Sequence, residues 1–152
     1  MTEDAMDDPH SPSEPGAPRH AGSAVATPPM NGALRSAISQ AIVRIHAEHY
    51  GKGATQAKTY VWDNLVVTVL RDVLTTAERT LVAVDRADAV REMRTTFQFT
   101  MEQTFRSAIE QLTGRRVLSF MSQVDPLNGL GVEVFVLAPR DAGGQDEGAS
   151  AD

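Results

Sequence analysis

The residues of this sequence that could do chemistry begin with two histidines, His46 and His49. They lie three residues apart in the amphipathic segment 32–49, so a helix would place both on one side, where two imidazoles can bind a metal ion. A third ligand is not evident, because Glu48 would point away from that side. We therefore predict no metal site, and we interpret both histidines as partly exposed side chains beside Tyr50.

The run Gly51-Lys52-Gly53 superficially resembles an anion-binding loop. Phosphate loops have a longer glycine frame that leads into a helix N-terminus, whereas these glycines follow a helix, at the negative end of its dipole. A helix C-cap with a favourably placed lysine is the expected structure. Lys52 could still contact an anion together with Lys58, or with Arg115 and Arg116, and these four cations are our predicted ligand-binding candidates.

The remaining polar residues are explained by turns and caps. Asp63-Asn64 has the composition of a tight turn, and Thr75 with Glu78 has the spacing of a capping box. The chain contains no cysteine, which excludes disulfides, thiolate catalysis and cysteine-ligated zinc. We predict no catalytic residue and no cofactor, and we expect a protein that is not an enzyme.

The elements that would position these residues follow the order α-β-β-α-α-β-β. Asn31, Thr75 and Asp88 are predicted helix N-caps, and Gly51 and Gly114 are predicted to end helices. The core-facing stripe of the third helix, which carries methionines and phenylalanines, is predicted to consist of Val90, Met93, Phe97, Met101, Phe105, Ala108 and Leu112. Apolar periodicity predicts helices at about 32–49, 76–84 and 89–113 and strands at 58–62, 65–70, 117–124 and 132–137.

Each pair of strands is predicted to form a hairpin. For the first pair the alternative is one long strand interrupted by a bulge at Asp63-Asn64. Hairpins flanked by helices favour an α+β fold in two layers, a four-stranded antiparallel sheet with helices on one face. The motif of a helix that ends in glycine and a cation before a hairpin occurs twice, at Gly51-Lys52 and at Gly114-Arg115.

The strands 65–70 and 132–137 are apolar on both of their faces. An antiparallel sheet with one face in water would alternate apolar and polar residues. Either another subunit covers the second face, which predicts a homodimer or a protein partner, or the long helix and its neighbours wrap more of the sheet.

Composition divides the chain into an acidic N-terminal tail (1–31), a domain (32–138) and an acidic C-terminal tail (139–152). The tails are rich in Pro, Gly, Ser, Ala and Asp and are predicted to be disordered. They carry most of the acidity behind the net charge of −6, so the domain is nearly neutral and does not favour nucleic acid. The sequence has no secretory signal and no apolar run long enough to insert into a membrane, which predicts a cytoplasmic protein.

The segments Tyr50-Gly51-Lys52-Gly53, Leu74-Thr75-Thr76-Ala77-Glu78 and Leu112-Thr113-Gly114 follow one another in an order and spacing that resembles a known family. Over about residues 33–138 the sequence looks like the MpsC-like family of small bacterial domains. The resemblance implies a link to a sodium-translocating, membrane-potential-generating system tied to inorganic-carbon supply. The membrane component of that system resembles an ion-pumping subunit of respiratory complex I.

The resemblance therefore implies a cytoplasmic accessory or regulatory protein, peripheral to the inner face of the membrane. Its partner would be an ion-translocating membrane subunit. The alternative is a small-molecule or anion-sensing regulatory module that uses the 51–53 loop with Lys52, Lys58, Arg115 and Arg116.

Overall fold

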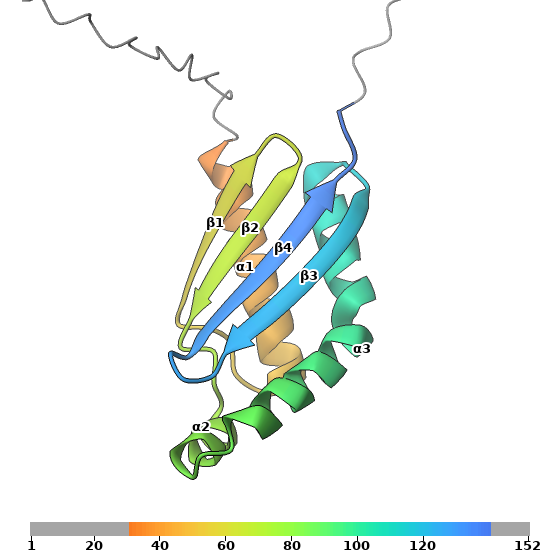
Figure 1. Cartoon of the computed structure of the whole chain (residues 1–152). Helices are drawn as coiled ribbons and strands as arrows, with labels where there is room; N and C mark the ends of the chain where they lie inside the picture. The colour runs from red at the N-terminus through yellow and green to blue at the C-terminus, as the bar shows by residue number, and fades with distance from the viewer. Residues whose placement is uncertain (1–30, 141–152) are drawn as a thin grey trace, which may run out of the picture.

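A four-stranded antiparallel sheet with helices on one face makes up residues 31–140, the part of the chain that the computed structural model describes (Figure 1). The predicted α+β class and element order are confirmed. The predicted tails, apart from residues 31, 139 and 140, lie outside the described residues. The elements are α1 (Gly32–Tyr50), β1 (Gln56–Trp62), β2 (Leu65–Arg71), α2 (Thr76–Ala83), α3 (Ala87–Thr113), β3 (Val117–Asp125) and β4 (Leu130–Leu137).

Local signals set most helix boundaries. The Asn31 side chain accepts a hydrogen bond from the Ala33 amide at 3.0 Å, and Gly51 and Gly114 end α1 and α3 with φ of 72° and 66°, in the left-handed region that glycine adopts without strain. The capping box at the start of α2 is present as predicted. The predicted cap at Asp88 is wrong: α3 begins at Ala87, and Asp88 lies in its first turn, where a negative charge favours the helix dipole.

Both predicted hairpins form, and the alternative of one long interrupted strand is wrong. β1 and β2 pair antiparallel around the two-residue turn Asp63-Asn64, in which Asp63 has φ of 47°. β3 and β4 form the second hairpin, and β2 pairs with β4, so the strand order is β1-β2-β4-β3. The two second strands of the hairpins are therefore the central strands of the sheet.

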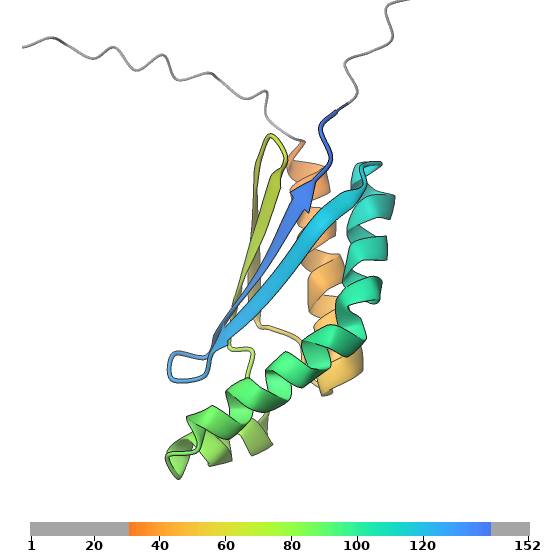
Figure 2. The same cartoon turned by 45° about the vertical axis from the view of Figure 1, so that its right-hand side comes forward.

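The helices α1 and α3 lie against the same face of the sheet, as Figure 2 shows from the side. Between them and the sheet lies one core of aliphatic and aromatic side chains, which includes Ile42, Leu70, Phe105 and Phe135. The N-terminal part of α3 continues past the end of the sheet, with α2 beside it (Figures 1 and 2). None of the described helices is long and apolar enough to cross a bilayer.

The core-facing stripe of α3 differs from the predicted one. Val90, Met101 and Phe105 are buried as expected, and Ala87, Arg94 and Ile109 are buried although the predicted stripe did not include them. Phe97 is only partly covered and contacts the Tyr50 ring, and Phe99 is 77% exposed. The physical reason is that the N-terminal part of α3 continues past the end of the sheet, so no strand covers it and fewer of its residues are buried.

Candidate functional site

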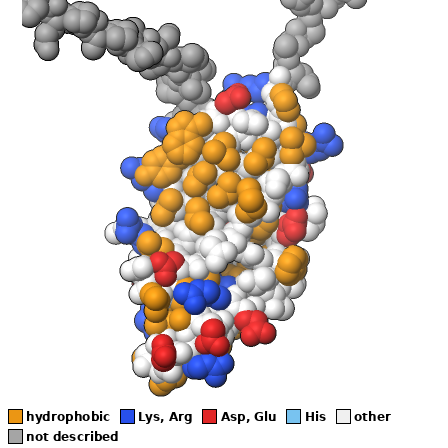
Figure 3. Space-filling model, in the orientation of Figure 1, with side chains coloured by type: hydrophobic (Ala, Val, Ile, Leu, Met, Phe, Trp, Pro, Cys, Tyr) orange, Lys and Arg blue, Asp and Glu red, His pale blue; other side chains and the backbone are white. Residues whose placement is uncertain are grey.

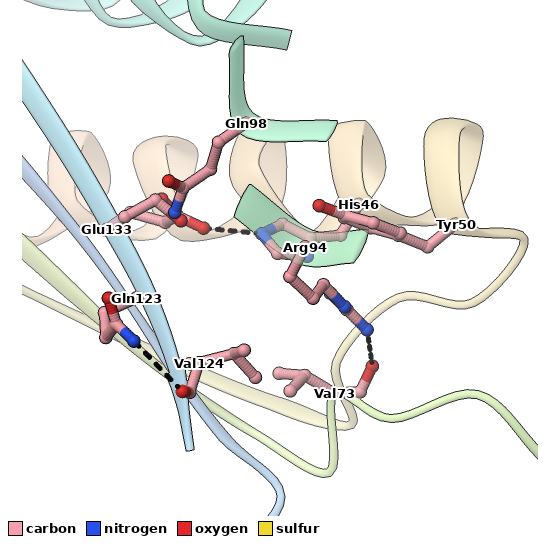
Figure 4. Close-up of a pocket in the computed structure, with 10 residues that line it drawn as sticks. His46, Tyr50, Val73, Arg94, Gln98, Gln123, Val124 and Glu133 are labelled. Atoms are coloured by element: carbon pink, nitrogen blue, oxygen red, sulfur yellow. Dashed lines mark hydrogen bonds and ion pairs between the residues drawn. The ribbon is translucent and has the colours of Figure 1, made fainter. Parts of the chain in front are cut away.

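A buried histidine–carboxylate pair lies between α1 and the centre of the sheet. His46 Nε2 and Glu133 Oε1 are 2.8 Å apart, and both side chains are almost fully buried (Figure 4). Helical periodicity turns His46 to the same side as the core residues Ile42 and Ile45, and strand alternation turns Glu133 to the same side as Phe135. The prediction of a partly exposed histidine is therefore wrong for His46, although His49 is exposed.

A buried ion pair lies beside it, at the junction of α2 and α3. The Arg94 guanidinium donates from Nε to Glu78 Oε1 at 2.6 Å and from Nη2 to Glu78 Oε2 at 2.7 Å. Nη2 also donates to the Val73 carbonyl at 2.8 Å, and the guanidinium lies 3.8 Å from the centre of the Tyr50 ring. The same Glu78 accepts the Thr75 amide in the capping box, so one carboxylate joins α2 to α3.

The surroundings shift the acidity of two of these groups. Burial alone raises the pKa of Glu78, but the hydrogen bonds from Arg94 and from the Thr75 amide outweigh it and hold the pKa below its ordinary value. For Tyr50, burial is the dominant cause and raises the pKa of the phenol, with Arg94 acting in the opposite direction. Glu78 is therefore ionised and Tyr50 neutral at pH 7.

A cavity of about 10 Å³ lies between the two pairs, lined by side chains that include His46, Arg94, Gln98 and Glu133. Glu133 Oε2 is buried without a hydrogen-bond partner among the protein atoms. The volume matches the requirement of roughly one water molecule, which is the usual partner of such an oxygen. The described residues contain no group of three or more side chains suited to hold a metal ion.

Hydroxyl groups extend this polar layer across the sheet. Ser39 of α1 is bonded to Thr59 of β1 at 2.7 Å, and Thr59 is bonded to Thr68 of β2 at 2.8 Å. Thr68 is the pairing partner of Glu133 in β4. Because each buried hydroxyl has a partner, the layer fixes the register of the strands beneath α1. The chemistry of this cluster is structural: it orients side chains and encloses space for about one water molecule.

The opposite face of the sheet is apolar, and none of the described helices covers it (Figures 2 and 3). Alternation along the strands places on this face the side chains that do not enter the core. Trp62 and Met121 are each 53% exposed, and the Trp62 ring stacks on Tyr60. Polar side chains such as Gln56, Arg71 and Asp125 lie toward one end of this face. Its apolar part, which we call the open-face patch, consists of Tyr60, Trp62, Leu65, Val67, Val69, Met121, Val132, Val134 and Val136.

The sequence left two explanations for the strands that are apolar on both faces. Among the described residues, α1 and α3 pack on one face and α2 lies past the end of the sheet, so the explanation in which the long helix wraps the second face is wrong. An exposed apolar surface of this extent is typical of an interaction site.

Two of the four predicted cations hold the backbone at hairpin ends. Lys52 donates to the carbonyls of Asp72 and Leu74, just after β2, and pairs with the Asp72 carboxylate at 2.9 Å. That hydrogen bond from Lys52 is the main reason why the pKa of Asp72 lies below its ordinary value. Arg115 bonds the carbonyl of Ala138, just after β4. The two cations that follow helix-ending glycines therefore have equivalent structural contacts.

The structure does not bring the four cations together in one place. Lys52 contacts residues that follow β2, whereas Arg115 also donates to the Asp63 carbonyl, before β2 begins. The seven-residue strand separates these positions by roughly 20 Å. Lys58 lies over the Tyr60 ring at the edge of the open-face patch, and Arg116 is exposed just before β3.

Sequence reasoning did not single out Glu133 or Arg94. The signal for Glu133 was present, because it is the one charged residue in the otherwise apolar segment 130–137. Arg94 follows the buried Val90 by four positions, which places it on the core side of α3. A carboxylate and a guanidinium at such positions indicate buried, paired charges.

Comparison with known proteins gives one match. The family model described as "Na+-translocating membrane potential-generating system (MpsC)" matches residues 30–139, which is more than two thirds of the chain. Neither a curated protein nor a solved structure matches this sequence.

Proposed function

This chain belongs to the MpsC family, and we propose that it is a non-enzymatic accessory or regulatory protein of a Na+-translocating, membrane-potential-generating system. It acts by protein–protein interaction in the cytoplasm, at the inner face of the membrane, and its partner is an ion-translocating membrane subunit. The family match links the chain to such a system, and the finer statements about role, place and partner are our proposal.

The observation that carries this proposal is the open-face patch. Nine apolar side chains from all four strands lie together on a face that no described helix covers. By contrast, the buried polar cluster encloses only about 10 Å³, which leaves no room for a substrate beside His46 and Glu133. The molecule thus offers a large contact surface, whereas its buried titratable groups are occupied with one another.

The test is crosslinking and co-purification of the tagged full-length chain from native membranes and cytosol, read by mass spectrometry. The proposal expects recovery of a polytopic ion-translocating membrane protein with the wild type. It also expects loss of that protein with the double variant W62E/M121E, which places charge on two half-exposed positions of the patch.

The matched control is F99E, which places the same charge on a 77%-exposed phenylalanine of α3, in the other layer. It should retain the membrane protein. Failure to recover such a protein with the wild type would refute the accessory role. Equal recovery with W62E/M121E would show that the contact does not depend on the open-face patch.

A second candidate, an anion-sensing module, is favoured by one local feature. Lys58 and Arg71 line the same shallow hollow at the β1–β2 edge, and neither belongs to an ion pair among the described residues. Thermal shift against phosphate, bicarbonate and nucleotides would test it. A shift that K58M abolishes and R116M preserves would support this candidate, and absence of any shift would end it.

A further inference from the structure

We propose that a second copy of this chain covers the open-face patch, related to the first by a two-fold axis that runs parallel to the strands between β2 and β4. The inference rests on the proposed function in one respect: the chain meets its membrane partner as a dimer, so the patch joins the two copies, and W62E/M121E releases the membrane protein by separating them. The two sheets would pack face to face in the aligned manner of a β-sandwich.

The distribution of polarity along the strands selects this axis. Cross-strand pairing arranges the face into rows, and the row Tyr60–Val67–Val134–Met121 is wholly apolar. Toward the other end of the strands the row Gln56–Arg71–Leu130–Asp125 is mostly polar. An axis parallel to the strands places each row on the same row of the second copy, whereas an in-plane axis across the strands would place charged side chains on apolar ones.

Side-chain sizes on the two halves of the face are complementary under this axis. The axis places β1 of one copy over β3 of the other, and β2 over β4. The bulky Trp62 then lies opposite the small Ser119, and the Tyr60 ring lies opposite the flexible Met121 thioether, a favourable sulfur–aromatic pairing. The central strands bring Val67 opposite Val134, two side chains of equal size.

The charged side chains on this face are also complementary under the proposed two-fold axis. Lys58 and Arg71 lie on the β1–β2 half of the face, and Asp125 ends β3 on the other half. The two-fold axis brings the cationic half of each copy over the half of the other copy that carries Asp125. Opposite signs therefore meet twice, at the rim, where interfaces carry their polar groups.

The area is sufficient for a specific dimer. Four strands spaced by about 4.8 Å, each about seven residues long, give a face of roughly 440 Å² in projection. The corrugated side-chain surface is somewhat larger, so the two copies together would bury about 1,000–1,200 Å², at the lower bound of specific interfaces.

The first experiment is sedimentation equilibrium of the purified full-length chain over the micromolar range. The wild type should be a dimer. In W62E/M121E, four carboxylates would be buried against apolar surface, so self-association should weaken by at least about a hundredfold. F99E should sediment as the wild type does, because Phe99 lies in the helical layer. A monomeric wild type, or a W62E/M121E variant that dimerises normally, would overturn the proposal.

The second experiment tests the axis, and the absence of cysteine from the sequence allows it. The variant Y60C/M121C is treated with a short bis-maleimide. Facing sheets are about 10 Å apart, whereas β1 and β3 of one copy lie on opposite edges of the sheet, about 14 Å apart. Covalent dimer should form with Y60C/M121C and not with Y60C or M121C alone. Crosslinking of the single variants at the same rate would refute this axis.

The two proposals fail separately. A monomeric chain that still recovers a polytopic membrane protein would refute the dimer and leave the accessory role intact. A dimer that recovers no membrane protein would refute the accessory role and leave the assignment of the face intact.

Discussion

Replacement of Arg94 by methionine tests the buried ion pair that joins α2 to α3. Methionine fills much of the same volume but removes the bonds to both Glu78 oxygens and to the Val73 carbonyl. The Glu78 side chain is only 2% exposed, so its charge would stay buried without a cation.

The free energy of unfolding that R94M is expected to lose is large relative to the total stability of a small domain. Removal of one partner of a buried ion pair costs about 3–5 kcal/mol, and domains of this size have about 5–15 kcal/mol in total. The double variant R94M/E78Q should lose only about 1–2 kcal/mol, because no buried charge remains and the glutamine can still accept the Thr75 amide.

The stability lost in R94M should depend on pH, and the contacts of Glu78 determine the sign of that dependence. In the wild type the pKa of Glu78 lies below its ordinary value of 4.5, because the bonds from Arg94 and Thr75 outweigh the raising effect of burial. Ionised Glu78 therefore stabilises the wild type above pH 4.5, and this contribution is lost as the pH falls through the native pKa. In R94M burial is no longer opposed by a cation, and the pKa rises. The difference in the free energy of unfolding between the wild type and R94M should therefore be widest at pH 7, and it should narrow as the pH falls toward 4.5.

The assay is urea unfolding followed by circular dichroism at pH 7 and at two lower pH values. R86M serves as the control, because the Arg86–Asp88 pair is exposed and its loss should leave the midpoint unchanged within error. A loss below about 1 kcal/mol in R94M, or a loss in R94M/E78Q as large as in R94M, would refute this account of the pair.

Three further predictions use the same unfolding assay. The free energy of unfolding of F135A should fall by about 3–5 kcal/mol because Phe135 is fully buried. That of F99A should change little because Phe99 is 77% exposed. Similar losses in the two variants would contradict the assignment of Phe135 to the core and Phe99 to the surface. T75A should lose about 0.5–2 kcal/mol, since it removes one half of the capping box, and an unchanged midpoint would contradict that cap. K52M should lose about 1–2 kcal/mol with the carbonyl bonds of Lys52, whereas R116M should stay within about 0.5 kcal/mol; equal effects would argue against a structural role for Lys52.

Much of the fold follows from residues that are close in the sequence. The caps at Asn31 and Thr75, the helix-ending Gly51 and Gly114, and the turn at Asp63-Asn64 each depend on a few neighbouring positions, and each forms as expected. The lack of apolar–polar alternation in the strands 65–70 and 132–137 also indicated that both faces of the sheet would be apolar. These signals are local because helix and strand periods are set by the backbone itself.

The candidate site depends on contacts that no local pattern specifies. His46 and Glu133 are 87 positions apart, and their pairing requires β4 to lie at the centre of the sheet beneath α1. Lys52 and Arg115 both follow a helix-ending glycine, yet their contacts lie near opposite ends of β2.

The sequence by itself therefore determined the elements, most of their caps and the apolar character of both faces of the central strands. The tertiary structure alone decided the strand order, which face the helices cover and which charges are buried as pairs. The physical reason is that a periodic pattern records how one segment meets its surroundings, whereas the identity of those surroundings is set by packing among segments far apart in the chain.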